Sequence, residues 1–383
     1  MAPSTRLIPT HVPWLAVITF LALSGALAWA VMMPVWLSPD RLRSSFALPL
    51  MVVMMFTPLT AALLVAFFVQ KPRPRPTAEY LGLWPLRPAG RVIGMSVVAV
   101  AGGLAIVVVG VFLAAALGLV DLDLVSFSGY AARLAALTPE PPPVPIGVLV
   151  ALQLVALPAG AVFNGLAAIG EELGWRGWLL PTLQPLGTWP TLLLTGTAWG
   201  LWHSPLILLG YNLNRPDLSG VAVMVVACVV LGVLLGWLRL RTGSVWPAVF
   251  GHGAFNAAAG FLGLVSAAGS SSDPTVTGPL GGVTWIVMGL VIITLILTGQ
   301  FAKQPRSVLS EENPVSDAAH DPSGPTQGAD TPGRYRRDSR QPGQHRRAGA
   351  LCSRCRADSG QLAATVVDAT PRLPSALSAF APA

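Results

Sequence analysis

The amino-acid sequence predicts an all-α, polytopic membrane protein with a disordered C-terminal tail. Of its 383 residues, 53% are hydrophobic and only 11% are charged, whereas a soluble domain carries about 25% charged residues. Apolar runs long enough to cross a bilayer, roughly 17–25 residues, recur as far as position 302. Charged residues fall almost entirely between these runs. Water is therefore not the main solvent of this chain.

We expect about eight membrane-spanning helices. Their predicted positions are 14–36, 47–69, 92–117, 147–181, 189–210, 219–238, 244–267 and 281–302. The first is long enough to remain in the membrane rather than act as a cleaved signal peptide. The fourth is overlong, which predicts tilt, a break or a projecting end, and Pro158, Gly160 and Pro181 are the candidate breaks.

Basic residues between the spans predict the orientation. The connections on the N-terminal side of the membrane hold most of them, at Arg6, Lys71, Arg73, Arg75, Arg87, Arg91, Arg176, Arg239 and Arg241. The opposite connections hold Arg41, Arg43, Arg133 and Arg215. The positive-inside rule then places both termini in the cytoplasm and the chain in the cell membrane. The formal charge of +7 is thus a feature of topology, and no nucleic-acid partner is expected.

The remaining segments divide the chain into four parts. We expect N-terminal spans and connections at 1–145, a catalytic core at 146–268, a final span at 269–302 and a disordered tail at 303–383. Within the outer loop 121–146 a short interfacial helix is predicted at 128–137. The basic cluster 334–347 either is solvated or touches anionic lipid.

The cysteines do not predict a disulfide framework or a zinc site. Cys228 lies in an apolar run and is expected to pack as a small hydrophobic side chain. Cys352 and Cys355 form a lone C-x-x-C pair, whereas a structural zinc ion needs about four ligands.

Two acids, two histidines and an asparagine one turn beyond the second histidine stand inside predicted spans, where charged groups are costly and usually functional. They are Glu171, Glu172, His203, His252 and Asn256. With a rise of 1.5 Å per residue, Glu171 lies roughly 16–20 Å from the cytoplasmic end of its helix, His203 roughly 20 Å, His252 roughly 13 Å and Asn256 roughly 19 Å. Three helices therefore bring polar groups to one level. The alternative is structural, with Arg176 neutralising the carboxylates and each histidine satisfied by a hydrogen bond.

This set of residues suits hydrolysis of a peptide bond. Glu171 would act as general base on a water molecule, assisted by His203, while His252 and Asn256 would stabilise the oxyanion. Glu172 lies about 100° away on the helix and would pair with Arg176 to brace the site. Glu171, His203 and His252 would also suit a catalytic zinc ion with a bound water. We favour the metal-free mechanism, although the spacing itself permits both.

Three motifs in these spans resemble those of the CAAX protease and bacteriocin-processing (CPBP, or abortive-infection) family of membrane peptidases. Glu171-Glu172-Leu-Gly-Trp-Arg176 resembles its E-E-x-x-x-R motif, Trp199-Gly-Leu-Trp-His203 its F-x-x-x-H motif with Trp for Phe, and His252-Gly-Ala-Phe-Asn256 its H-x-x-x-N motif. The resemblance covers about residues 150–265. It implies an all-helical membrane fold, a site open to the cytoplasm, and a membrane-associated or lipidated peptide or protein as substrate.

Two other functions are compatible with the sequence. The same fold could serve as a non-catalytic bacteriocin-immunity or scaffold protein. Intramembrane Glu and His residues also occur in the relays of proton-coupled transporters, but the two halves of this chain show no convincing internal repeat of the kind that many carriers have. Beyond the zinc alternative, no cofactor is expected.

Overall fold

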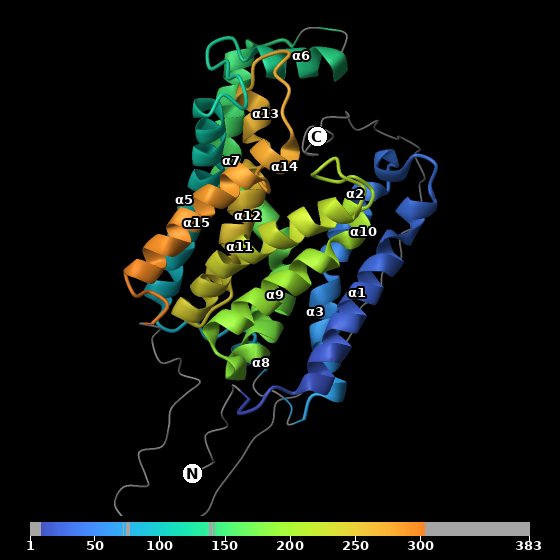
Figure 1. Cartoon of the computed structure of the whole chain (residues 1–383), viewed down its shortest axis with the longest axis vertical. Coiled ribbons are helices and arrows are strands. Elements are labelled where there is room, and N and C mark those ends of the chain that lie inside the picture. The colour runs from blue at the N-terminus through green and yellow to red at the C-terminus, as the bar shows by residue number, and fades with distance from the viewer. Residues whose placement is uncertain (1–8, 72, 74–76, 138–139, 141, 303–383) are drawn as a thin grey trace, which may run out of the picture. The chain divides into compact units, whose positions relative to one another are not determined.

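The computed structural model describes residues 9–71, 73, 77–137, 140 and 142–302, which belong to one compact unit (Figure 1). The predicted tail 303–383, with Cys352, Cys355 and the cluster 334–347, lies outside the described residues. Within the described part the chain forms helices and no strand, with one isolated bridge between Leu122 and Ser266. The prediction of an all-α fold is therefore confirmed.

The elements follow one another as α-helices (α) and short 3₁₀ or π segments (η). They are α1 (Trp14–Leu37), η1 (Arg41–Arg43), α2 (Ala47–Met55), α3 (Thr57–Leu64), η2 (Val65–Val69), α4 (Thr77–Tyr80), α5 (Ala89–Ala116), α6 (Ser128–Leu137), α7 (Ile146–Glu172), η3 (Leu173–Leu179), α8 (Leu180–Leu183), η4 (Gln184–Leu186), α9 (Thr188–Trp202), α10 (Ser204–Ile207), α11 (Leu218–Thr242), α12 (Trp246–Ala258), α13 (Phe261–Val265), α14 (Pro274–Thr277) and α15 (Gly282–Leu297). The short helix predicted at 128–137 is present as α6.

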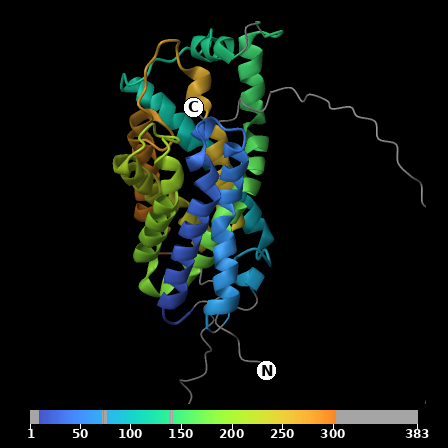
Figure 2. The ribbon, with the colours of Figure 1, turned by 90° about the vertical axis from the view of Figure 1, so that its right-hand side faces the viewer.

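Seven helical segments among the described residues are long and apolar enough to cross a membrane. They are Trp14–Leu37, Ala47–Val69, Ala89–Ala116, Ile146–Leu186, Leu218–Thr242, Trp246–Val265 and Pro274–Leu297. Each matches a predicted span, and the chain is a multi-pass membrane protein. In Figure 2 the long helices run close to the vertical axis, and in Figure 1 α9, α11 and α15 cross it obliquely.

The fifth predicted span, 189–210, is not one long helix. It consists of α9 and the four-residue α10, which meet at His203. Pro205 explains the break, because proline lacks the N–H that would continue the hydrogen-bond ladder to the carbonyl of Leu201, four residues earlier. The two pieces still carry the chain across the bundle. Thr191 donates a hydrogen bond to the carbonyl of Leu183 at one end, and Trp36, near the far end of α1, donates to the carbonyl of Pro205 at the other.

The overlong fourth span is a composite of α7, η3, α8 and η4 that runs for 41 residues. At 1.5 Å per residue it is about 60 Å long, twice the roughly 30 Å of bilayer hydrocarbon. Pro158 was a candidate break, but α7 continues through it. The hydrogen-bond pattern changes instead at η3, a π-helical segment. Such segments are rare and are often found at functional sites.

Large apolar side chains cover the outer surface of the long helices, and the charged groups of the spans lie inside the bundle among a mainly apolar core. Val155 and Phe163 of α7 are 79% and 72% exposed, whereas Glu172 and Arg176, further along the same composite helix, are fully buried. The outer surface of the long helices is therefore suited to hydrocarbon, and the interior holds the polar groups.

Glycine and alanine let α12 lie very close to both α5 and α7. A Cβ atom at Gly253 would lie 2.2 Å from the carbonyl oxygen of Ala161 on α7, and one at Gly103 of α5 would lie 2.8 Å from the carbonyl oxygen of Gly251. The pair Gly196 and Gly200 brings α9 equally close to α11. Small residues at helix crossings are typical of membrane bundles, and these crossings fix the helices that carry the polar residues.

Candidate active site

The two consecutive carboxylates stand at the C-terminal end of α7, where the α-helix gives way to η3. Glu171 is 3% exposed and Glu172 is fully buried. Because neighbouring residues of a helix point about 100° apart, the two side chains reach different partners. Glu172 contacts Arg176 and His252, and Glu171 contacts Trp199.

Glu172 is the centre of a buried ionic group. Its Oε1 lies 2.8 Å from Arg176 Nη1, one turn further along the composite helix, so the pairing expected from their spacing is present. The same oxygen lies 2.9 Å from Nδ1 of His252 on α12. His252 was expected at the oxyanion site, and its contact with Glu172 is an addition that the sequence did not predict. This contact ties α12 to the end of α7.

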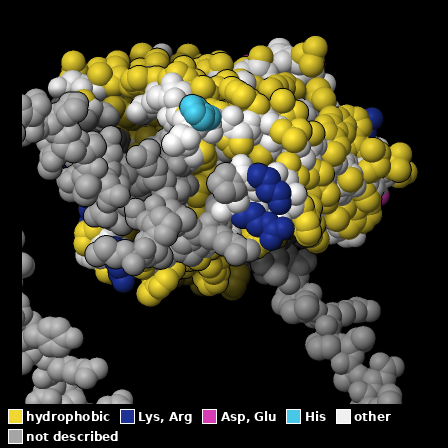
Figure 3. All heavy atoms as spheres, turned by 90° about the horizontal axis from the view of Figure 1, so that it is seen from below, with side chains coloured by type: hydrophobic (Ala, Val, Ile, Leu, Met, Phe, Trp, Pro, Cys, Tyr) yellow, Lys and Arg dark blue, Asp and Glu magenta, His cyan; other side chains and the backbone are white. Residues whose placement is uncertain are grey.

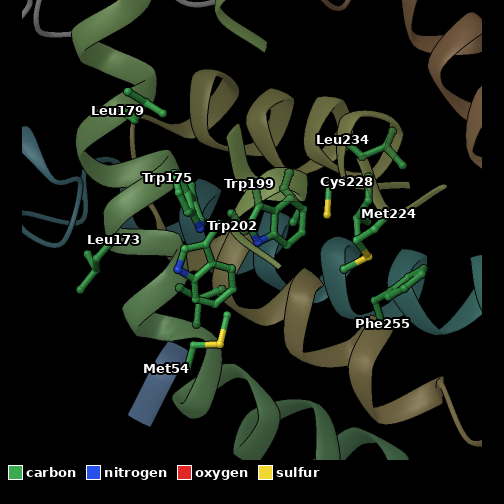
Figure 4. Close-up of a cluster of buried hydrophobic side chains, with 14 of the residues drawn as sticks. Met54, Leu173, Trp175, Leu179, Trp199, Trp202, Met224, Cys228, Leu234 and Phe255 are labelled. Carbon is green, nitrogen blue, oxygen red and sulfur yellow. The ribbon is translucent and has the colours of Figure 1, made fainter. Parts of the chain in front are cut away.

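Trp199 of α9 occupies the middle of the site. Its Nε1 donates a hydrogen bond of 2.7 Å to Glu171 Oε2. Its ring lies 4.1 Å from the guanidinium carbon of Arg176 and meets the ring of His252 edge to face at 5.2 Å. Figure 4 shows Trp199 beside Trp175 and Trp202. From the motif, Trp199 was expected to be only an aromatic replacement for Phe, but its N–H makes a contact that Phe cannot make.

His203 stands at the break between α9 and α10. Its Nδ1 lies 2.9 Å from the carbonyl oxygen of Trp199 and 3.8 Å from Sγ of the buried Cys228. Since a carbonyl oxygen can only accept, the hydrogen bond to Trp199 requires the proton on Nδ1 and leaves a lone pair on Nε2 when the imidazole is neutral.

Glu171 and His203 were expected to act as a pair. Among the described residues no hydrogen bond joins them directly. Trp199 links them instead, because its side chain binds Glu171 and its backbone carbonyl binds His203. Any shared action on a water molecule would therefore place that molecule between two groups that Trp199 holds.

Asn256 lies on α12, one turn beyond His252, as its spacing predicts. It is partly exposed, and its side-chain amide makes no hydrogen bond to a described residue. The structure thus brings Glu171, Glu172, Arg176, Trp199, His203 and His252 into one network of contacts, and leaves Asn256 beside it with its amide free.

The residues proposed as zinc ligands do not form a ligand cluster. Within the described part of the chain, no three His, Cys, Asp or Glu side chains are arranged to hold a metal ion. The zinc alternative for Glu171, His203 and His252 therefore does not fit this arrangement.

Arg239 of α11 is a residue that the sequence analysis misplaced. It was counted among the connections as a topological charge, but it is only 3% exposed. Its guanidinium donates to the carbonyl oxygens of Arg176 at 3.1 Å and Tyr80 at 3.0 Å, and also to that of Gly243. It thereby joins η3 to α11 and to the α4 turn. A charge at the end of an apolar run does not reveal whether it is buried, so the sequence offered no signal for this role.

The fold and the site define an intramembrane protein with a buried Glu-Glu-Arg-His-His cluster held by separate helices. Residues 152–258, which contain every residue of this cluster and Asn256, match the model of a family described as type II CAAX prenyl endopeptidase Rce1-like. A segment of 81 residues is 31% identical to the CAAX prenyl protease 2 of Methanococcus maripaludis. In this region the chain is therefore similar to CAAX-type membrane peptidases.

The similarity to the archaeal protein is limited in extent. The matched segment covers 20% of this chain and 30% of the length of that relative. The first three spans, α15 and the tail lie outside the region that the family model matches.

Proposed function

We propose that the protein is an intramembrane endopeptidase that hydrolyses a peptide bond of a membrane-associated or lipidated substrate. The observation that carries the proposal is the contact network around Trp199, which joins Glu171, Arg176, His203 and His252 within the family-matched residues 152–258. The name of the archaeal relative suggests prenylated CAAX sequences as the first substrates to test.

Glu171 is the general base in the proposed mechanism. A water molecule between Glu171 and His203 loses a proton to this pair, and the resulting hydroxide attacks the carbonyl carbon of the scissile bond. The tetrahedral intermediate then collapses. Its C–N bond breaks, and the proton taken from the water passes to the leaving amine. The hydrogen bond from Trp199 occupies Glu171 Oε2, so Oε1 is the oxygen that faces the water.

His252 and Asn256 stabilise the oxyanion in this mechanism. To donate from Nε2, His252 must carry a proton there as well as the one on Nδ1 that it shares with Glu172. In this arrangement His252 donates to Glu172 from one ring nitrogen and to the oxyanion from the other.

We propose that the end of the bundle at which the composite helix finishes, after η4, faces the cytoplasm. Figure 3, a view of this end, shows Lys and Arg side chains on the surface, and the positive-inside rule favours the cytoplasm for such an end. Reporter fusions after residues 70 and 120 test the orientation. The first should report a cytoplasmic position and the second an external one, and the reverse result would invert the topology.

The activity is tested by incubating the purified protein in liposomes with a mixed membrane-peptide library that includes farnesylated CAAX peptides. Mass spectrometry of the products should reveal cleavage at a defined bond, with or without a chelator. Cleavage abolished by the chelator would contradict the metal-free mechanism. If a protein of native stability cleaved none of the peptides, the non-catalytic alternative would be favoured.

A further inference from the structure

A hollow lies on the outside of the bundle, between α5, α7 and α12. It has a volume of about 770 Å³. Its walls are almost entirely apolar, and Val97 and Leu104 of α5, Val162 of α7 and Phe250 of α12 are among the lining residues. The one polar side chain in the lining belongs to Ser96, whose hydroxyl donates to the carbonyl of Val92 in its own helix. The groove therefore offers no polar group to a ligand and suits hydrocarbon.

The groove is directed toward the lipid. Ile93 and Val97 in its wall are 59% and 65% exposed, and Val162 is 45% exposed. All three lie on helices that are apolar and long enough to span a membrane. From Val92 to Leu104 the groove extends about 18 Å along α5, which is close to the thickness of one leaflet, about half of the roughly 30 Å hydrocarbon core.

One end of the groove carries positive charge. Arg87 and Arg91 fall between Leu86 and Val92, both of which line the groove. Arg87 is exposed and Arg91 half-buried, and neither pairs with a carboxylate among the described residues. Trp246, at the same end, donates its N–H to the carbonyl of Leu83, and tryptophan is typical of the level where lipid headgroups begin.

We propose that this groove binds an anionic glycerophospholipid, with an acyl chain between α5, α7 and α12 and its phosphate at Arg87 and Arg91. The apolar walls match the chain, and the two arginines match the phosphate in charge and hydrogen-bonding geometry. The site is separate from the candidate active site. Phe250 in the groove and His252 in the cluster are two residues apart on α12, which places them about 200° apart around the helix.

Native mass spectrometry tests this proposal, using the full-length protein and the probes phosphatidylglycerol and phosphatidylcholine with identical chains. We expect the wild type to retain one phosphatidylglycerol in preference to phosphatidylcholine. The double variant Arg87→Gln/Arg91→Gln should lose this preference, by roughly fivefold for each arginine and about 25-fold in total. Because both arginines lie at the surface, this variant should fold normally.

A second pair of variants tests the chain-binding part. Ala101→Trp fills the groove and should remove the bound lipid, whereas Val109→Trp adds the same bulk to an exposed position of α5 outside the groove and should not. Retention of the lipid by Ala101→Trp, or an unchanged headgroup preference in the double arginine variant, would overturn the proposal. None of these measurements depends on peptidase activity.

Discussion

The buried ion pair between Glu172 and Arg176 allows a quantitative test of how the site is held together. Arg176→Met keeps much of the volume of the side chain but removes its charge. Both partners have side chains that are at most 1% exposed, and their atoms lie 2.8 Å apart. Removing one member of such a pair costs about 3–5 kcal/mol because it leaves a buried charge unpaired. Loss of the contact with the ring of Trp199, at 4.1 Å, adds about 0.5–2 kcal/mol.

The free energy of unfolding can be measured by SDS titration in mixed micelles, followed by tryptophan fluorescence. Arg215→Met is a matched control, because Arg215 and Asp273 lie at nearly the same distance, 2.9 Å, but are 50% and 40% exposed. An exposed pair contributes at most about 1 kcal/mol, so the control should change stability little.

A double variant separates the stranded charge from other effects of the substitution. Glu172→Gln/Arg176→Met removes both charges, and we expect it to recover at least half of the stability that Arg176→Met loses. A loss below about 1 kcal/mol for Arg176→Met would refute the view that this pair is desolvated. Strict additivity of the two single variants would refute the coupling between them.

Three further predictions concern residues around the site. Trp199→Phe keeps an aromatic ring against Arg176 but removes the N–H that binds Glu171. A hydrogen bond to a charged group contributes about 1.5–3 kcal/mol, so kcat in the peptide-cleavage assay should fall roughly 10- to 100-fold with little change in KM. Equal changes in kcat and KM would argue against a role of Trp199 in orienting the base. Arg239→Lys should lower the unfolding midpoint nearly as much as Arg239→Gln, because an ammonium cannot reproduce three hydrogen bonds to carbonyls in separate segments. A wild-type unfolding midpoint in Arg239→Lys would show that the charge alone matters. Burial raises the pKa of Tyr80 to about 12. Its neutral form therefore stabilises the fold up to the ordinary tyrosine pKa of about 10, and this contribution is lost as pH rises toward 12. The unfolding free energy of Tyr80→Phe should fall less steeply than that of the wild type across this interval, and parallel plots of unfolding free energy against pH would contradict the assignment.

Much of the fold could be predicted from the sequence because lipid imposes simple rules. A bilayer span needs about 20 apolar residues with no unsatisfied backbone groups, and seven of the expected spans are present as long helices. The exception, 189–210, depends on Pro205, whose effect on α9 is local and is hidden within a continuously apolar run. The π-helical segment η3 likewise has no signal in composition or periodicity.

The members of the site could be predicted more readily than their contacts. Charged and polar groups inside spans identified Glu171, Glu172, His203 and His252, because desolvation makes such groups rare unless they have a role. Which atoms meet depends on helix rotation and on the close crossings that glycines allow. For that reason the bond from His252 to Glu172 and the link through Trp199 could not be derived from spacing.

The central claim is that Glu171 activates water, and Glu171→Gln tests it most directly. The amide oxygen of Gln can still accept the hydrogen bond from Trp199, so the site should keep its geometry, but the side chain cannot take up a proton. In liposomes with a cleaved peptide as substrate, we expect the rate to fall by at least 10²-fold while the unfolding midpoint stays at the wild-type value. Wild-type activity in Glu171→Gln would contradict the assignment of the base and with it the proposed mechanism.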